Sequence, residues 1–122
     1  MIELSGIVVE GKHIGHKIGF PTANIKPDAS AVIPDIGVYA GEIHIDDGDP
    51  IWYRCLIDHG FQPTIPSGRE TIEVFILDFH RNIYGARVEL RFTDYLREEV
   101  KFDSVKSLQA QLKRDEQTVR AL

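Results

Sequence analysis

The stretch Ala86-Arg87-Val88-Glu89-Leu90-Arg91-Phe92-Thr93 decides the fold class of this chain. Apolar and polar side chains alternate throughout it, so the apolar set points one way and the charged set points the other. This alternation is typical of an antiparallel strand with one buried face and one solvated face. We therefore expect a half-buried antiparallel strand here, in a mainly β protein.

Further strand-like segments precede it. Residues 7–9, 38–45, 51–57 and 71–79 are rich in β-branched and aromatic side chains, and the turn at 46–50 predicts a hairpin between the second and third of them. No helical pattern separates these segments. The sequence therefore predicts about five or six antiparallel strands that close into a small barrel.

The hydrophobic period changes after this region and indicates a C-terminal helix. The apolar residues that recur near one helical face are Val105, Leu108, Leu112, Val119 and Leu122. Either Asp103 or Ser104 can cap its start, and Glu116 and Arg120 form a favourable i,i+4 pair. We expect this helix to pack on the barrel and bury its apolar face.

Composition bounds the function. A chain of 122 residues with 43% hydrophobic and 27% charged residues is typical of one globular domain. Its net charge of -5 argues against a nucleic-acid partner. Cys55 is the one cysteine and begins the apolar run Cys55-Leu56-Ile57, so we expect it in the core. No apolar stretch or leader pattern indicates a membrane span or a signal peptide, so we expect a cytoplasmic protein without a membrane partner.

The first candidate site runs from Gly11 to Asn24. Its glycines recur every four residues, and such spacing lets backbone N–H groups form a concave anion site. The residues that contribute glycine flexibility or charge are Gly11, Lys12, His13, Gly15, His16, Lys17 and Gly19. Thr22 and Asn24 lie two residues apart, which on a strand directs them to one face, and their neutral oxygens suit Mg²⁺. The alternative interpretation is a glycine-rich hairpin loop without a ligand.

Two other places are candidates for chemistry. Glu73 lies in a strand whose two faces are both apolar, which indicates partial burial and a stronger proton acceptor. The alternative is a glutamate that reaches solvent at a strand end. Residues 96–103 mix charge with Phe102 between the last strand and the helix. They form either a ligand-binding loop or a charged connector.

At these places the chain resembles the riboflavin kinase family, over roughly Gly6 to Leu122. The most specific match is Gly19-Phe20-Pro21-Thr22-Ala23-Asn24. Further matches in chain order are Gly37-Val38-Tyr39-Ala40-Gly41, Gly60 with Pro63-Thr64, Glu73-Val74, Ile76 to Phe79, Tyr84-Gly85, Leu96-Arg97 with Glu99, Lys101 to Ser104, Leu108, Asp115 and Arg120 to Leu122.

The resemblance implies a six-stranded antiparallel Greek-key barrel with a C-terminal α-helix. The riboflavin kinase domain would occupy residues 1–122, with the barrel at about 3–96, a flavin loop at about 97–103 and the helix at about 104–121.

The resemblance also implies roles for the matching residues. Glu73 would be the catalytic base, and Thr22 and Asn24 would bind Mg²⁺. The nucleotide-binding residues would be Gly11, Gly15, His16, Lys17, Gly19, Pro21 and Thr22, with residues 63–69 on the nucleotide side. The flavin-binding residues would be Arg97, Glu99, Phe102 and Asp103.

Four positions depart from the family pattern. His16 stands where the family usually has Arg, and Phe75 stands where it commonly has His. Asp58-His59-Gly60 replaces the usual Asn-Ile-Gly. A neutral His16 predicts weaker, pH-dependent phosphate binding, and Phe75 removes a polar neighbour from Glu73.

We expect an ATP:riboflavin 5′-phosphotransferase that produces FMN and ADP, either alone or as part of a bifunctional FAD synthetase. The departures leave a catalytically weak flavin- and nucleotide-binding module as an alternative. A barrel domain that binds neither ligand is a third possibility.

Overall fold

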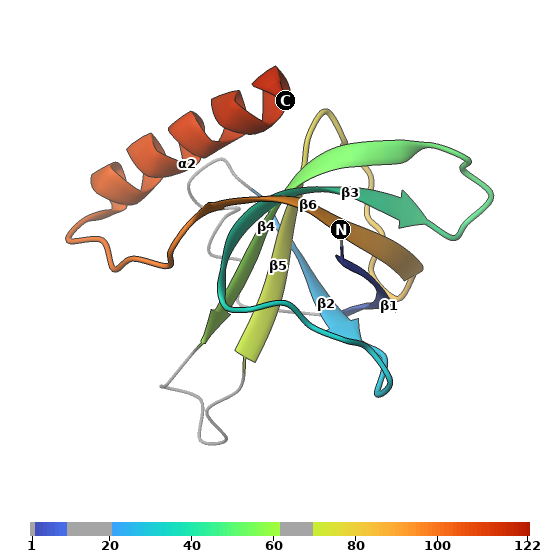
Figure 1. Cartoon of the computed structure of the whole chain (residues 1–122). Coiled ribbons are helices and arrows are strands. Elements are labelled where there is room, and N and C mark those ends of the chain that lie inside the picture. The colour runs from blue at the N-terminus through green and yellow to red at the C-terminus, as the bar shows by residue number, and fades with distance from the viewer. Residues whose placement is uncertain (1, 10–20, 62–69) are drawn as a thin grey trace.

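The computed structural model describes residues 2–9, 21–61 and 70–122. The strands are β1 (Ile2–Val9), β2 (Ala23–Pro27), β3 (Gly37–Ile45), β4 (Trp52–Phe61), β5 (Glu70–Ile76) and β6 (Arg87–Arg97), and the helix is α2 (Val105–Ala121). The strands form a closed antiparallel barrel in the order β1-β2-β5-β4-β3-β6, with α2 outside it (Figure 1). The predicted six-stranded barrel with a C-terminal helix is confirmed.

Alternation along the strands fills the barrel. In β6, Val88 and Leu90 have no exposed surface and Phe92 is buried, whereas Arg87 on the other face is exposed. Cys55 lies in the same interior cluster, as predicted. The predicted half-buried antiparallel strand is therefore confirmed from Arg87 onward.

The pairing of β3 with β6 is irregular. The register between these strands shifts at Ala40/Gly41, and a Cβ atom on Gly41 would collide with the carbonyl oxygen of Arg91. A glycine at such an irregularity lets two backbones approach and a strand bend. The long strands β3 and β6 can therefore belong to one small closed sheet.

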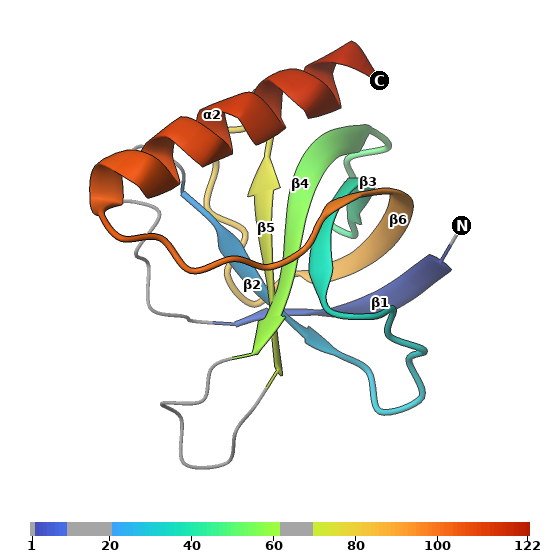
Figure 2. The ribbon, with the colours of Figure 1, turned by 60° about the vertical axis from the view of Figure 1, so that its left-hand side comes forward.

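The helix α2 covers part of the outside of the barrel (Figure 2). Val119 is buried there against Val38, Leu56 and Leu77, so β3 and β4 are buried on both faces. Ser104 is the N-cap, since its hydroxyl accepts a hydrogen bond from the Ser107 N–H. In the part of the chain that the structure describes, no helix is long and apolar enough to cross a bilayer.

The apolar helix face is narrower than predicted. Val105 and Leu122, at its two ends, are exposed, and the position between Leu112 and Val119 that faces the barrel is taken by Asp115. The predicted pair is confirmed, with Arg120 Nε 2.9 Å from Glu116 Oε2. Arg120 also binds Asp78 at 2.9 Å.

Strand β5 ends earlier than predicted. It stops at Ile76, and Asp78 has a left-handed backbone with φ of 56°. This turn redirects Phe79, which packs edge-to-face on Tyr53 with ring centroids 4.9 Å apart. The prediction that one strand continues from residue 71 to residue 79 is therefore wrong at its C-terminal end.

Candidate active site

Three polar side chains form a row across the outer face of the barrel. Asn24 on β2 is directly opposite Glu73 on β5, and Glu73 is directly opposite Asp58 on β4. Their chain neighbours Val74 and Ile57 point into the core, so the row points outward. Directly opposed side chains have Cβ atoms about 5 Å apart. The predicted base Glu73 is partly buried and lies between an amide and a second carboxylate.

The connection from β6 to α2 passes over this row (Figure 2). A Cβ atom on Gly60 would lie 2.7 Å from Glu99 Oε1 and 3.4 Å from Asp58 Oδ1. The carboxyl groups of Glu99 and Asp58 therefore flank Gly60. Although part of the Glu99 side chain is exposed, its surroundings desolvate the carboxyl group and raise its pKa.

Arg97 ties this connection to the helix. Its guanidinium holds Asp115 in a two-pronged contact, with Nη2 to Oδ2 at 2.8 Å and Nε to Oδ1 at 3.1 Å. Gln111 donates a further hydrogen bond of 2.9 Å to Asp115. Asp115 is 4% exposed, so these donors compensate a buried charge. The described contacts of Arg97 thus hold the loop, and its predicted contact with a flavin stays a prediction.

Phe102 lies on the same side, with its ring centroid 5.9 Å from the Arg97 guanidinium, while Asp103 is exposed.

The sequence matched Asp115 to the family but did not reveal its partner Arg97. The signal was present as an acidic residue on an otherwise apolar helical face.

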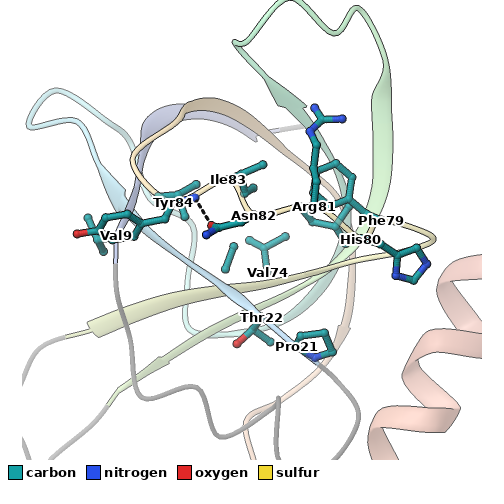
Figure 3. A pocket seen from close by; sticks show the side chains of 13 residues that line it. Val9, Pro21, Thr22, Val74, Phe79, His80, Arg81, Asn82, Ile83 and Tyr84 are labelled. Atoms are coloured by element: carbon teal, nitrogen blue, oxygen red, sulfur yellow. Dashed lines mark hydrogen bonds between the residues drawn. The ribbon is translucent and has the colours of Figure 1, made fainter.

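A pocket of about 600 Å³ opens at one end of the barrel. Figure 3 shows Pro21 and Thr22 on one side and Asn82, Ile83 and Tyr84 on the other. Most of its remaining lining is apolar, from Val8, Val9, Ala23, Val74, Ile76 and Phe79. A largely apolar cavity with a few polar groups at its edge is typical of a small-molecule site.

The wall of this pocket is held by an ion-pair network. Arg81 Nη2 lies 3.0 Å from Asp47 Oδ2 and 3.1 Å from Asp49 Oδ2 in the β3–β4 turn. The Tyr53 hydroxyl donates to Asp49 at 2.6 Å, and this hydrogen bond is the main cause of a lowered Asp49 pKa. The Arg81 guanidinium also covers Phe79, 4.8 Å from its ring centroid. The acidic turn, which the sequence identified only as a hairpin turn, therefore positions residues 79–84.

Thr22 and Asn24 join the two places. Thr22 lines the pocket, whereas Asn24 belongs to the outer row beside Glu73. Thr22 precedes β2, so strand alternation does not fix its direction as the sequence analysis assumed. Among the described residues, no cluster of three or more His, Cys, Asp or Glu side chains could hold a metal. A hydroxyl and an amide oxygen still fit Mg²⁺ that is bound together with phosphate oxygens.

His59 replaces an apolar residue of the family pattern. It is buried inside the barrel, with Nδ1 3.2 Å from the Asp35 carbonyl and Nε2 3.1 Å from Glu70 Oε2. It thus links the β2–β3 connection to the start of β5, and the departure has a structural role. Gly11, Gly15, His16, Lys17 and Gly19 and residues 63–69, which were predicted to bind nucleotide, lie outside the described residues.

Comparisons with known proteins assign this chain to a family. The family model described as riboflavin kinase matches residues 1–122. A bifunctional riboflavin kinase/FMN adenylyltransferase of Listeria monocytogenes is 40% identical over 117 residues, which cover 95% of this chain and 36% of that protein. The RNA-binding riboflavin kinase RibR of Bacillus subtilis is 40% identical over 116 residues, covering 94% of this chain and 48% of that protein.

The crystal structure of riboflavin kinase from Trypanosoma brucei superimposes with a TM-score of 0.68 at 26% identity, covering 98% of this chain and 78% of that one. This chain thus spans between about a third and a half of the length of the two curated relatives. The chain belongs to the riboflavin kinase family.

Proposed function

We propose that this chain transfers the γ-phosphate of ATP to the 5′-hydroxyl of riboflavin, which gives FMN and ADP. The observation that carries the proposal is the position of Glu73 opposite Asn24. This pair lies between a barrel-end pocket lined by Thr22 and a face covered by the loop that contains Glu99. Two substrates bound at these places would meet at residues 22–24.

The nucleotide base occupies the barrel-end pocket in this proposal. The Phe79 ring and the apolar lining suit a planar heterocycle, and Thr22 at the rim is positioned for the phosphates. Pro21 and the glycine-rich segment with Gly11, Gly15, His16, Lys17 and Gly19 supply the rest of the phosphate site.

The flavin lies along the outer row. Glu99, Phe102 and Asp103 contact the ring, and Arg97 contributes by holding this loop against Asp115. The 5′-hydroxyl then reaches Glu73, which orients it and accepts its proton late, as charge builds on the transferred group. A flavin bound over this partly buried row would exclude water that otherwise competes as phosphate acceptor.

Thr22 and Asn24 would hold Mg²⁺ with the phosphates. When bound, the metal supplies neutralisation of phosphate charge. The side chains keep the hydroxyl acceptor and the phosphate in line, which is the main requirement of phosphoryl transfer.

The environment of Phe75 argues against the weak-module alternative. Phe75 packs with Leu56, Leu77 and Val119 under the helix. Its replacement of the usual histidine is therefore accommodated as part of the packing beside Glu73.

The test is a flavin fluorescence titration with and without Mg-ATP, followed by chromatographic detection of FMN. ATP, CTP and GTP are compared in the same assay. We expect FMN formation with ATP and Mg²⁺, and no product when the metal is chelated. Binding of riboflavin without any FMN would instead identify a binding module.

The Listeria monocytogenes relative carries both kinase and adenylyltransferase in its name. We infer that the natural polypeptide works with an FMN adenylyltransferase, either as a further domain or as a separate enzyme that consumes FMN. Assay of FAD formation by the natural polypeptide distinguishes these arrangements.

A further inference from the structure

Asp58 has a buried carboxylate oxygen that needs a donor. Its Oδ1 atom is inaccessible to solvent and has no hydrogen-bond partner in the part of the chain that the structure describes. A buried acceptor without a donor costs free energy, and a charged one costs more. Such an atom in a binding face indicates a ligand that supplies the hydrogen bond.

The backbone directs this oxygen into the outer row. Asp58 is opposite Glu73 on β5, and its chain neighbours Ile57 and His59 are buried on the inner side. His59 is pinned by Asp35 and Glu70. The position of Asp58 on the strand therefore directs its side chain into the outer row.

Among the described residues, the side chains around Asp58 are acidic. Glu99 and Asp58 both flank Gly60, and Glu73 lies opposite Asp58 on the neighbouring strand β5. Arg97, the basic residue at the start of the overlying loop, is bound to Asp115. Asp58 therefore faces acceptors, and a ligand that fits here presents hydroxyl donors rather than another anion.

A flavin with its 5′-hydroxyl at Glu73 supplies such donors through the remaining hydroxyls of its ribityl chain. Opposed side chains are about 5 Å apart, a separation that an extended chain of about four carbon–carbon bonds of about 1.5 Å spans. We propose that Asp58 accepts a hydrogen bond from a ribityl hydroxyl other than the reacting one, and so selects a polyol chain on the flavin. This inference rests on the proposed function and adds a specificity residue to it.

The test compares two isosteric variants against two ligands. D58N keeps an acceptor oxygen, whereas D58L has the same shape without one. Riboflavin carries the ribityl chain, and lumiflavin has the ring alone. Dissociation constants are measured by flavin fluorescence, and FMN formation by the wild-type protein is checked in parallel.

We expect D58L to weaken riboflavin binding about tenfold or more and D58N to weaken it less. Lumiflavin binding should change less than twofold in both variants. D94L, the same change at an exposed site on β6, should leave both affinities unaltered.

Equal losses for riboflavin and lumiflavin would overturn the proposal, because Asp58 would then shape the ring site. Unchanged flavin binding with a raised Mg²⁺ requirement would also overturn it and assign Asp58 to the metal. If the wild-type protein forms FMN and D58L binds riboflavin normally, only this inference fails. If the wild-type protein neither binds riboflavin nor forms FMN, the proposed function fails first.

Discussion

The barrel-end pocket and the outer polar row differ in how their polar groups are satisfied. The pocket wall is held by Arg81, which binds both Asp47 and Asp49, so its charges are paired before any ligand arrives. The outer row instead contains Glu99, whose pKa is raised, and Asp58, one oxygen of which has no hydrogen-bond partner among the described residues. The protein itself therefore preorganises the pocket wall, whereas Asp58 needs a hydrogen-bond donor from the ligand.

The two places are coupled through a short piece of chain. Thr22 contributes to the pocket and Asn24 contributes to the row. A substitution confined to one place should therefore change binding of one substrate, and a substitution at the junction should change the reaction itself.

Glu73→Gln gives the largest expected effect. Glutamine cannot accept the proton, so kcat should fall about 10²- to 10⁴-fold, with riboflavin and ATP dissociation constants within about threefold of wild type. FMN formation and equilibrium binding measure the two quantities. Glu89→Gln, on the outer face of β6, is the matched control and should keep full turnover. Near-normal turnover in the Glu73 variant would remove it from the role of base.

Asp115→Ala should give the next largest effect, a loss of folding stability. It leaves Arg97 and Gln111 without their shared acceptor, and loss of one partner of a buried pair costs about 3 kcal/mol. Urea unfolding measures this loss. Flavin affinity should fall more than nucleotide affinity, because the loop is attached through Arg97.

The control for Asp115 is its neighbour Glu116. Glu116→Ala removes an i,i+4 surface pair and should cost at most about 0.5 kcal/mol. If both substitutions lowered the free energy of unfolding equally, Asp115 would not be a buried charge that Arg97 and Gln111 compensate.

Arg81→Met should loosen the pocket wall with little effect on folding. Loss of this surface network should shift the pocket wall and cost of the order of 1 kcal/mol of ATP binding free energy. We therefore expect the KM for ATP to rise about three- to tenfold, while the KM for riboflavin stays constant. Arg87→Met, which removes a surface pair with Asp28 away from the pocket, is the control. A rise in both KM values would contradict the assignment of this wall to the nucleotide.

Glu99→Gln should give the smallest effect, visible in its pH dependence. Because the folded protein raises the pKa of Glu99, it disfavours the charged form. This penalty is absent below the ordinary pKa of a glutamate and develops as the pH rises through the raised pKa. The variant should therefore be slightly more stable than wild type at pH 7 and equal to it near pH 4. Glu98→Gln serves as the control, and a larger gain at pH 4 than at pH 7 would reverse the sign.

Much of the fold was predictable because it depends on local periodicity. The alternation from Ala86 to Thr93 and the turn at 46–50 each correspond to an observed strand or hairpin. The end of β5 was not predictable, because the apolar run continues to Phe79 while the positive φ of Asp78 turns the chain. Residues 105 and 122 fit the helical period, but their exposure depends on how far the barrel extends beneath α2.

The site was predictable only in part. The register that places Asn24, Glu73 and Asp58 in one row joins three strands that are distant in sequence, so no local pattern contains it. The contacts of Arg81 with Asp47 and Asp49, and of Arg97 with Asp115, likewise connect segments that only the closed barrel brings together.

Backbone amide chemical shifts under separate titration with riboflavin and with Mg-ADP test the two-place account most directly. Riboflavin should shift residues 56–60, 72–75 and 97–103, and Mg-ADP should shift residues 8–9 and 79–84. Both ligands should shift residues 22–24. If the two ligands perturb the same residues, or if Mg-ADP leaves residues 79–84 unchanged, the assignment of the pocket to the nucleotide and of the outer row to the flavin is contradicted.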